Sequence, residues 1–353
     1  MKKILVIQQK MIGDVLTSSI LFEALRKEYP TAQLDYLIQP HTLPVVEHNP
    51  YIDHVILDRQ DASGNAISLL AFAKRIQAEN YDAIIDIYSK IGTAIVTSRS
   101  GAKYRIGYKK WYTKLAYSHT FSYGEEATTR AGLAIENRLK VLEPLSSNFP
   151  LALKPKIYLR PDEIEAARSF LTEKGVTGNQ KPIMISLLGS SSSKTYPLKY
   201  MKEIVETAAQ AIDAPLLLNY IPKQKAQVDE FLSMCDEETQ KKIRGDIYAK
   251  SLRAFLGILS QCRAIVGNEG GAINMAKALD IPTFAIYAPT TRRKSWDSYP
   301  GPKQVAVHLN DYAPALFEDK NKKEIRAEND ELYSHFTPDL IMPELTEFFK
   351  NIY

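Results

Sequence analysis

The sequence predicts an α/β fold made of two Rossmann-like domains, each a doubly wound parallel sheet, that face one another across a cleft. Short apolar segments rich in β-branched residues alternate with amphipathic helical patterns, and a strand–helix–strand alternation produces parallel sheets. The apolar segments contain few polar residues, which is typical of strands covered by helices on both faces. The alternation stops and restarts once, and 353 residues suit two domains at roughly 150 residues each.

The expected strands share an apolar composition and occupy residues 4–7, 34–38, 54–57, 83–87, 183–188, 216–218, 264–266 and 284–287. Between about residues 104 and 160 we expect no strand, because several prolines interrupt the chain there. We place the domain boundary near residue 175, which gives a first domain of residues 1–175 and a second of residues 176–335. Residues 336–353 contain an apolar-periodic helix, which we expect to pack back toward the first domain.

Composition excludes several classes of protein. Hydrophobic residues make up 45% and charged residues 24%, and no apolar run approaches the roughly 18 residues of a membrane-spanning helix. The net charge of +4 is too small to indicate a nucleic-acid-binding protein. Polar residues up to Lys10 end the first apolar run well short of a signal-peptide core, so we expect a cytoplasmic protein. Cys235 and Cys262 are expected to be packed thiols rather than a disulfide.

The first candidate functional residue is Asp14, which follows Gly13 where the first loop becomes a helix. A carboxylate at this place is usually an N-cap that accepts hydrogen bonds from free backbone N–H groups. The functional alternative is a carboxylate aimed into the cleft as a general base. The loop lacks the G-x-G-x-x-G spacing, so a dinucleotide-binding fingerprint is absent.

The second candidate is the loop that follows the strand at 183–188. It contains small and hydroxyl residues, Gly189, Ser190 and Ser191, followed by Lys194. Hydroxyl groups and a lysine after a strand can hold a phosphate, although the Walker A pattern is not satisfied. The alternative is a polar loop with a solvated lysine.

The third candidate is the segment after the strand at 264–266, with small residues at a helix start. It comprises Glu269, Gly270, Gly271 and Ala272, and Asn274 follows inside the helix. Bare N–H groups and the helix dipole favour an anion at such a place, so we expect a pyrophosphate site, with a plain glycine-rich turn as the alternative. The six histidines lack the paired spacings of a zinc site, so no metal is expected.

Together these segments resemble glycosyltransferase family 9, the lipopolysaccharide heptosyltransferases, over nearly the whole chain. The first strand is followed by Gly13-Asp14, and Arg105-Ile106-Gly107-Tyr108 is similar to a family element. Lys194-Thr195-Tyr196-Pro197 resembles the family's Lys-x-Trp-Pro. Residues 268–279, Asn-Glu-Gly-Gly-Ala-Ile-Asn-Met-Ala-Lys-Ala-Leu, resemble the family's Asn-Asp-Ser-Gly-Pro-Met-His-Leu-Ala-Ala-Ala-Leu.

The resemblance implies the GT-B fold, with an acceptor-side first domain and a second domain that binds a nucleotide diphosphate sugar, ADP-linked by preference. It implies metal-independent transfer of heptose or a related sugar with inversion and without a cofactor, in which Asp14 is the base. Lys194 and the helix start at Gly270 would hold the diphosphate, and Lys223 and Lys250 are candidates for nucleotide contact. The chain departs from the family where Asp, Ser and His become Glu269, Gly270 and Asn274, and where a lysine, Lys223, follows the strand at 216–218.

The implied acceptor is a lipid-linked saccharide such as a lipopolysaccharide core, at the inner face of the cytoplasmic membrane, where the protein would be peripheral. The loops over residues 103–114 mix basic and aromatic side chains and are candidates to receive a phosphorylated sugar, with ordinary surface packing as the alternative. A nucleotide-sugar epimerase of the same architecture and a non-catalytic nucleotide-binding module are the competing functions. The epimerase would consume donor without an acceptor, and the module would leave the nucleotide intact.

Overall fold

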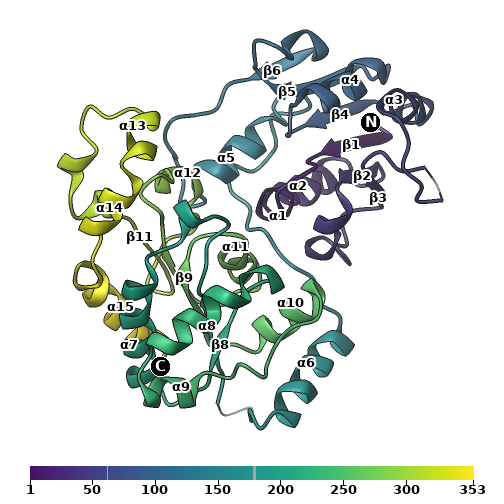
Figure 1. Cartoon of the computed structure of the whole chain (residues 1–353). Helices are drawn as coiled ribbons and strands as arrows, with labels where there is room; N and C mark the ends of the chain where they lie inside the picture. Colours follow the sequence, from purple (N-terminus) through teal and green to yellow (C-terminus); the bar gives the residue numbers. More distant parts are fainter. Residues whose placement is uncertain (62, 178–179) are drawn as a thin grey trace. The chain divides into compact units, whose positions relative to one another are not determined.

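The computed structural model describes residues 1–61, 63–177 and 180–353, which form two compact units, Met1–Tyr158 and Leu159–Tyr353. Each unit is built on one parallel sheet with helices around it (Figure 1). The central strands are buried along nearly their whole length, which agrees with their apolar sequences and with helices on both faces. The predicted fold class of two doubly wound parallel sheets is therefore confirmed.

The first unit contains a six-stranded sheet in the order β3-β2-β1-β4-β5-β6. Its strands are β1 Lys3–Ile7, β2 Gln33–Ile38, β3 His54–Leu57, β4 Ala83–Asp86, β5 Tyr104–Tyr108 and β6 His119–Phe121. The α-helices are α1 Ile12–Ser18, α2 Ile20–Glu28, α3 Leu69–Ala78, α4 Ile91–Arg99 and α5 Leu133–Lys140, with short 3-10 helices η1 Pro40–Val45 and η2 Lys114–Ala116. Because all strand pairs are parallel, the loops that follow the strands meet at one edge of the sheet.

The expectation of no strand between residues 104 and 160 was wrong, because β5 and β6 lie there. The β5 sequence Tyr-Arg-Ile-Gly-Tyr mixes charged and apolar residues, and β6 is a three-residue strand at the sheet edge with two exposed residues. Neither segment has the continuous apolar run of a central strand, so the apolar pattern does not reveal them.

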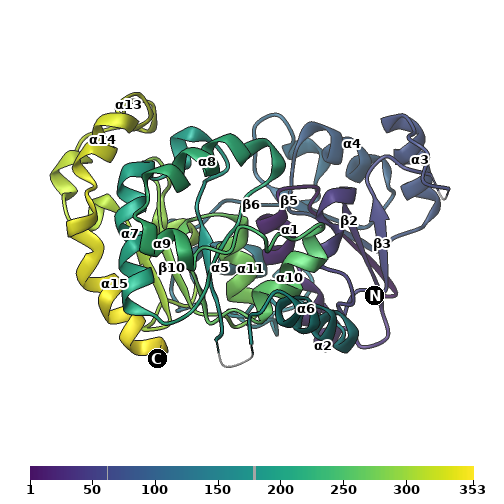
Figure 2. The ribbon, with the colours of Figure 1, turned by 60° about the horizontal axis from the view of Figure 1, so that its bottom comes forward.

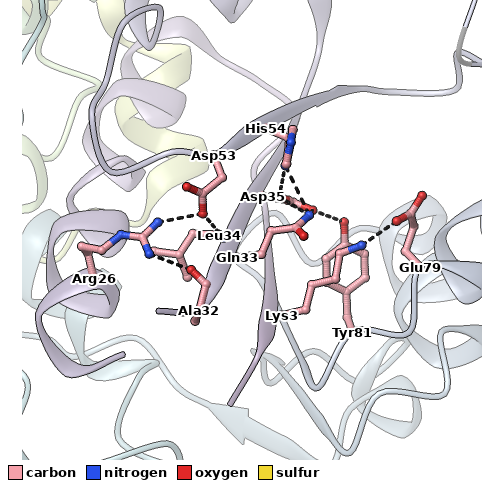
Figure 3. Close-up of polar contacts among 10 residues, drawn as sticks. All are labelled: Lys3, Arg26, Ala32, Gln33, Leu34, Asp35, Asp53, His54, Glu79 and Tyr81. Atoms are coloured by element: carbon pink, nitrogen blue, oxygen red, sulfur yellow. Dashed lines mark hydrogen bonds and ion pairs between the residues drawn. The ribbon is translucent and has the colours of Figure 1, made fainter. Parts of the chain in front are cut away.

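Polar side chains connect the amino-terminal half of this sheet (Figure 3). Asp35, buried on β2, accepts hydrogen bonds from the Gln33 amide and from the Tyr81 hydroxyl at 2.6 Å, and it lies 3.1 Å from Nδ1 of His54. Arg26 forms an ion pair with Asp53 at 2.7 Å. A buried carboxylate is tolerable only when it is well hydrogen-bonded, and here these partners also hold neighbouring strands together. The opposite edge of the sheet carries the candidate residues.

The second unit contains a five-stranded parallel sheet in the order β11-β10-β9-β7-β8. Its strands are β7 Ile183–Ser186, β8 Leu216–Leu218, β9 Ala264–Asn268, β10 Thr283–Ile286 and β11 Gln304–Val307. The 3-10 helices are η3 Ser192–Lys194, η4 Pro222–Gln224, η5 Leu309–Asp311 and η6 Pro314–Leu316. The α-helices are α6 Pro161–Glu173, α7 Leu198–Ala211, α8 Lys225–Met234, α9 Glu237–Lys242, α10 Leu252–Ser260, α11 Gly271–Ala278, α12 Arg293–Trp296, α13 Lys322–Ala327, α14 Asn329–His335 and α15 Pro338–Ile352. Edge strand β11 was not predicted, because three of its four residues are only half-buried.

The second unit begins earlier than the expected boundary at residue 175. Helix α6 packs against α10, where Arg253 donates to Glu163 at 2.7 Å and Gly257 leaves room for the methyl group of Ala167. These contacts place residues 161–173 in the second unit. The sequence pattern indicates the start of this unit only at its first strand, β7. The two buried cysteines, Cys235 and Cys262, are free thiols, as expected.

Helix α15 also differs from expectation. Its apolar face, which includes Ile341, Leu345 and Phe348, is fully buried in the core of the second unit, where the helix packs against α7 and β11. Figure 2 shows α15 beside α7. The expected packing of residues 336–353 toward the first domain is therefore replaced by packing within the second. None of the described helices is long and apolar enough to cross a membrane.

Candidate active site

In the first unit, Asp14 lies in the first turn of α1, which begins two residues before it. One carboxylate oxygen accepts a hydrogen bond from Arg138 at 2.7 Å. The other accepts a long bond, 3.3 Å, from the backbone N–H of Met11. The side chain is 27% exposed. Asp14 is therefore not the N-cap that the local pattern favoured, and its second oxygen is only weakly engaged within the protein.

Arg138, on α5, is buried and fixes the orientation of the Asp14 carboxylate. Its Nε donates to the Ser18 hydroxyl at 2.9 Å, and its Nη1 donates to the carbonyl oxygen of Ala134 at 2.8 Å. Because these hydrogen bonds fix the orientation of the planar Arg138 guanidinium, its ion pair with Asp14 has a defined geometry. The sequence analysis missed Arg138, because 124 residues separate it from Asp14 and it belongs to no recognisable motif.

On β4, the strand beside β1, the carboxyl end carries a second acidic group, Asp86, which is completely buried. It accepts hydrogen bonds from the Tyr117 hydroxyl and from the backbone N–H of Ser89, both at 2.7 Å. Gly107 on β5 makes room for the tyrosine ring, since a Cβ there would lie 2.6 Å from it. Burial raises the pKa of Asp86 to about 6, although these hydrogen bonds and the charge of Lys110 lower it in part.

In the second unit, the loops after β7 and β9 are joined at the carboxyl edge of the sheet. Gly267 has φ +128°, and a Cβ there would lie 2.4 Å from the Ser186 carbonyl oxygen, so the two strand ends approach as closely as glycine permits. The amide of Asn268 donates to the carbonyl oxygens of Ser186 and Leu187 and accepts from the backbone N–H of Tyr196 at 2.7 Å. Asn268 thus holds both ends of the loop that contains Lys194.

Within this loop, Ser190, Ser191 and Lys194 are exposed, and Lys194 ends the short helix η3. Gly189 is buried, and its N–H donates to the Thr195 hydroxyl at 3.0 Å. A Cβ at Gly189 would lie 2.2 Å from the carbonyl oxygen of Lys194, so the loop closes tightly on itself. The lysine and the two serines therefore stand on a fixed turn at the sheet edge.

The loop after β9 leads into α11 through Glu269 and Gly270. A Cβ at Gly270 or Gly271 would meet open space, so no neighbouring atom crowds the start of the helix there. The first N–H groups of a helix have no partner within it, and they can bind an anion. Ala272 is buried, and the backbone N–H of Asn274 already bonds to Gly270 within the helix. The predicted residues 269–274 therefore divide into an open helix start and a packed first turn.

Glu269 is half-buried, and its backbone N–H donates to the carbonyl oxygen of Ile286 on β10. Burial raises the pKa of its carboxyl, while the positive charges of Lys194 and Lys277 lower it in part. The influence of Lys194 shows that the two loops share one electrostatic environment.

Lys223 and Lys250 are both exposed and lie in loops at the same sheet edge. Lys223 belongs to η4, where the neighbouring Gln224 donates to the carbonyl oxygen of Gly189 at 3.4 Å. Lys250 lines an apolar cavity of about 360 Å³ between α6 and α10, together with Phe170. Gln224, which links this loop to the Lys194 loop, was not singled out from the sequence. Among the described residues, no group of three or more His, Cys, Asp or Glu side chains is arranged to hold a metal ion.

The two parallel-sheet α/β units have the GT-B architecture, and solved structures agree with this fold. A glycosyltransferase family 9 structure from Veillonella parvula superposes with a TM-score of 0.74 at 16% identity, covering 99% of this chain and 97% of that chain. The structure of E. coli ADP-heptose lps heptosyltransferase II gives a TM-score of 0.66 at 18% identity, covering 95% and 99% of the two chains. At these identities the likeness shows the fold.

The family follows from the sequence comparisons. Residues 69–325, more than half of the chain, match the model of glycosyltransferase family 9 (heptosyltransferase), so the chain belongs to this family and is a glycosyltransferase. A curated relative, lipopolysaccharide heptosyltransferase 1 of Campylobacter coli, is 23% identical over 82% of this chain and 84% of its own length.

We predict that Asn268→Ala destabilises the protein by about 2–4 kcal/mol, because it leaves two buried carbonyl oxygens and one N–H without partners. Urea unfolding measures the loss, and hydrogen exchange at the Tyr196 amide should become faster. Asn274→Ala, on the accessible side of α11, is the matched control and should change stability by less than about 0.5 kcal/mol. Equal stabilities of the two variants would contradict this role of Asn268.

The burial of Asp86 predicts a pH dependence of stability. Its pKa is about 6 in the folded chain against an ordinary value of 3.8, so the folded state binds more protons between these values and stability falls as pH rises through them. Asp86→Asn should therefore gain about 3 kcal/mol in free energy of unfolding, relative to the wild type, between about pH 4 and pH 7. Urea titrations across this range measure the difference, with exposed Asp213→Asn as control. A difference that stays constant with pH would disprove the prediction.

Proposed function

We propose that this glycosyltransferase moves a heptose or a related sugar from an ADP-linked donor to a lipopolysaccharide core or a related lipid-linked glycan. The observation that carries the proposal is the joining of the Lys194 loop to the open start of α11 by Asn268. A lysine and bare helix N–H groups are suited to a diphosphate leaving group. Support for the sugar comes from the heptosyltransferase relatives and from the similar fold of E. coli ADP-heptose lps heptosyltransferase II.

In the proposed reaction, Asp14 accepts the proton of the acceptor hydroxyl while the acceptor oxygen bonds to the anomeric carbon of the donor sugar. The bond from that carbon to the diphosphate breaks at the same time, so the configuration inverts and no covalent sugar intermediate forms. Negative charge grows on the departing diphosphate, where Lys194 and the N–H groups at Gly270 and Gly271 stabilise it. No metal takes part in this scheme.

The proposal divides the work between the units. The first unit binds the acceptor and supplies Asp14, and the second binds the nucleotide sugar, with Lys223 and Lys250 available to the nucleotide. Glu269, Gly270 and Asn274 replace residues typical of the family, and all three lie at the proposed diphosphate site, so they are the positions at which donor choice would differ. The protein would work at the inner face of the cytoplasmic membrane, where a lipid-linked acceptor is available.

Asp14→Asn tests the base. The amide keeps the shape and can still accept one hydrogen bond from Arg138, but it cannot take up the acceptor proton. We expect kcat to fall about 100- to 1000-fold, with the affinity for the nucleotide diphosphate nearly unchanged. The unfolding midpoint should fall, because the buried Arg138 guanidinium loses its charged partner. Sugar transfer and calorimetric nucleotide binding are measured on the same preparation. Transfer at the wild-type rate would refute the assignment of the base.

A thermal-shift panel of ADP, GDP, UDP and CDP tests the donor site, since a ligand at 100 times its Kd stabilises the native state by about 2.7 kcal/mol. We expect ADP to give the largest shift. Lys194→Ala should weaken binding of that nucleotide about 10- to 100-fold, because a charged hydrogen bond to phosphate contributes about 1.5–3 kcal/mol. Lys241→Ala, an exposed lysine on α9, is the control. A larger response to another nucleotide would change the donor, and undiminished binding by the Lys194 variant would remove its phosphate role. Consumption of donor without an acceptor would instead indicate an epimerase.

A further inference from the structure

The loop between β5 and β6 exposes apolar side chains to an unusual degree. We call residues 109–115 the Trp111 loop. The exposed fractions are 87% for Trp111, 94% for Leu115 and 41% for Tyr112. Ile91, at the start of α4, is 63% exposed, and α4 packs against η2 at the end of this loop. Large apolar side chains gathered on one exposed surface mark a place of interaction.

The Trp111 loop is held in shape by polar contacts on its inner side. Lys110 donates through Nζ to the carbonyl oxygens of Tyr88 and Ser89, at 3.2 and 2.9 Å. The backbone N–H of Lys114 bonds to the carbonyl oxygen of Lys110 at 2.9 Å, and Tyr117 anchors the following residues on Asp86. Because these contacts fix the loop from within, Trp111 and Leu115 stay exposed on the first unit, where an external surface can contact them.

The charge around the loop is strongly one-sided. Residues 87–124 contain seven Lys or Arg and no Asp or Glu. The charge of this segment, +7, exceeds the net charge of the whole chain, +4. Lys90, Lys109 and Lys114 are exposed beside the apolar side chains. A copy of the chain that presented the same surface would place like charges against each other, which disfavours self-association through it. A surface that complements the Trp111 loop would carry negative charge on its outside and apolar groups beneath that charge.

We propose that the Trp111 loop, together with Ile91, docks the protein onto an anionic lipid bilayer. Trp111, Tyr112 and Leu115 enter the interfacial region, where aromatic rings are favoured, and the lysines contact lipid phosphates. The loop follows β5 at the same sheet edge as Asp14, so docking brings this edge to the membrane surface. The inference rests on the proposed function only in that a lipid-linked acceptor gives the docking its purpose.

Vesicle binding tests the proposal without any need for catalysis. The full chain is mixed with phosphatidylcholine vesicles, with or without phosphatidylglycerol, and the bound fraction is measured by flotation. We expect binding to the anionic vesicles only, weakened by salt. Leu115→Asp and Trp111→Ala should each reduce the partition coefficient about tenfold or more, and Lys109→Gln and Lys114→Gln about fivefold each. Leu151→Ala and Lys140→Gln, exposed elsewhere in the first unit, are matched controls with no expected effect.

Tryptophan fluorescence places the loop directly. The chain has two tryptophans, so Trp296→Phe leaves Trp111 as the single emitter. Its emission should shift to shorter wavelength on anionic vesicles and be quenched by brominated lipid chains. Emission that does not change when the protein binds vesicles would show that another surface makes the contact, and would overturn the proposal.

Sugar transfer to a delipidated, water-soluble acceptor tests the docking proposal separately from the proposed function. Leu115→Asp should leave that transfer unchanged and should slow transfer only to acceptor embedded in vesicles. Equal loss on both acceptors would mean that the loop binds the saccharide itself, and a dimer in sedimentation that Leu115→Asp dissolves would mean that a second copy covers it. Either result overturns the docking proposal. If no acceptor is glycosylated but the vesicle pattern holds, the proposed function fails and the docking surface stands.

Discussion

The candidate donor site depends on one buried side chain, the amide of Asn268. Its two N–H groups bind the chain leaving β7, and its oxygen binds the chain approaching α7, so one residue fixes both ends of the Lys194 loop. Gly267 makes this possible by letting β9 approach the Ser186 carbonyl oxygen to a distance that any Cβ would prevent. The exposed lysine therefore stands on a loop whose position is set by the hydrogen bonds of the Asn268 side chain to the backbone, and not by contacts of the lysine itself.

The carboxylate of the first unit is organised by a different principle. Asp14 is oriented by an ion pair with Arg138, and that guanidinium is itself fixed by a hydroxyl and a helix carbonyl oxygen. A group that must accept a proton benefits from an orientation fixed before the substrate arrives, because reorganisation then costs little during the reaction. Asp86, at the end of β4, has a different environment, in which burial raises its pKa and the hydroxyl group of Tyr117 is a hydrogen-bond partner.

Much of the fold and part of the site could be predicted from the sequence. Buried central strands such as β1 and β9 are continuous apolar runs, and the helix start at Gly270 is recognisable from its small residues. The sequence analysis missed β5 and β6, whose residues are mixed, and the edge strand β11, which is short and only half-buried. The roles of Arg138 and Asn268 were not predicted, because each depends on hydrogen-bond partners that are distant in the sequence. No local sequence pattern reveals such partners. Helix α15 has an apolar face that the sequence shows clearly, but the pattern does not say which core receives it.

Asn268 and the adjacent Glu269 have different roles, and this difference affects how such enzymes can diversify. Asn268 is committed to the scaffold, whereas the side chain of Glu269 and the space above Gly270 and Gly271 are not needed to hold the loops together. Mutations can therefore accumulate at the neighbouring positions without loosening the scaffold. An enzyme of this kind could therefore change the sugar nucleotide that it binds through a few such replacements. No compensating mutation would be needed to keep the two loops in place.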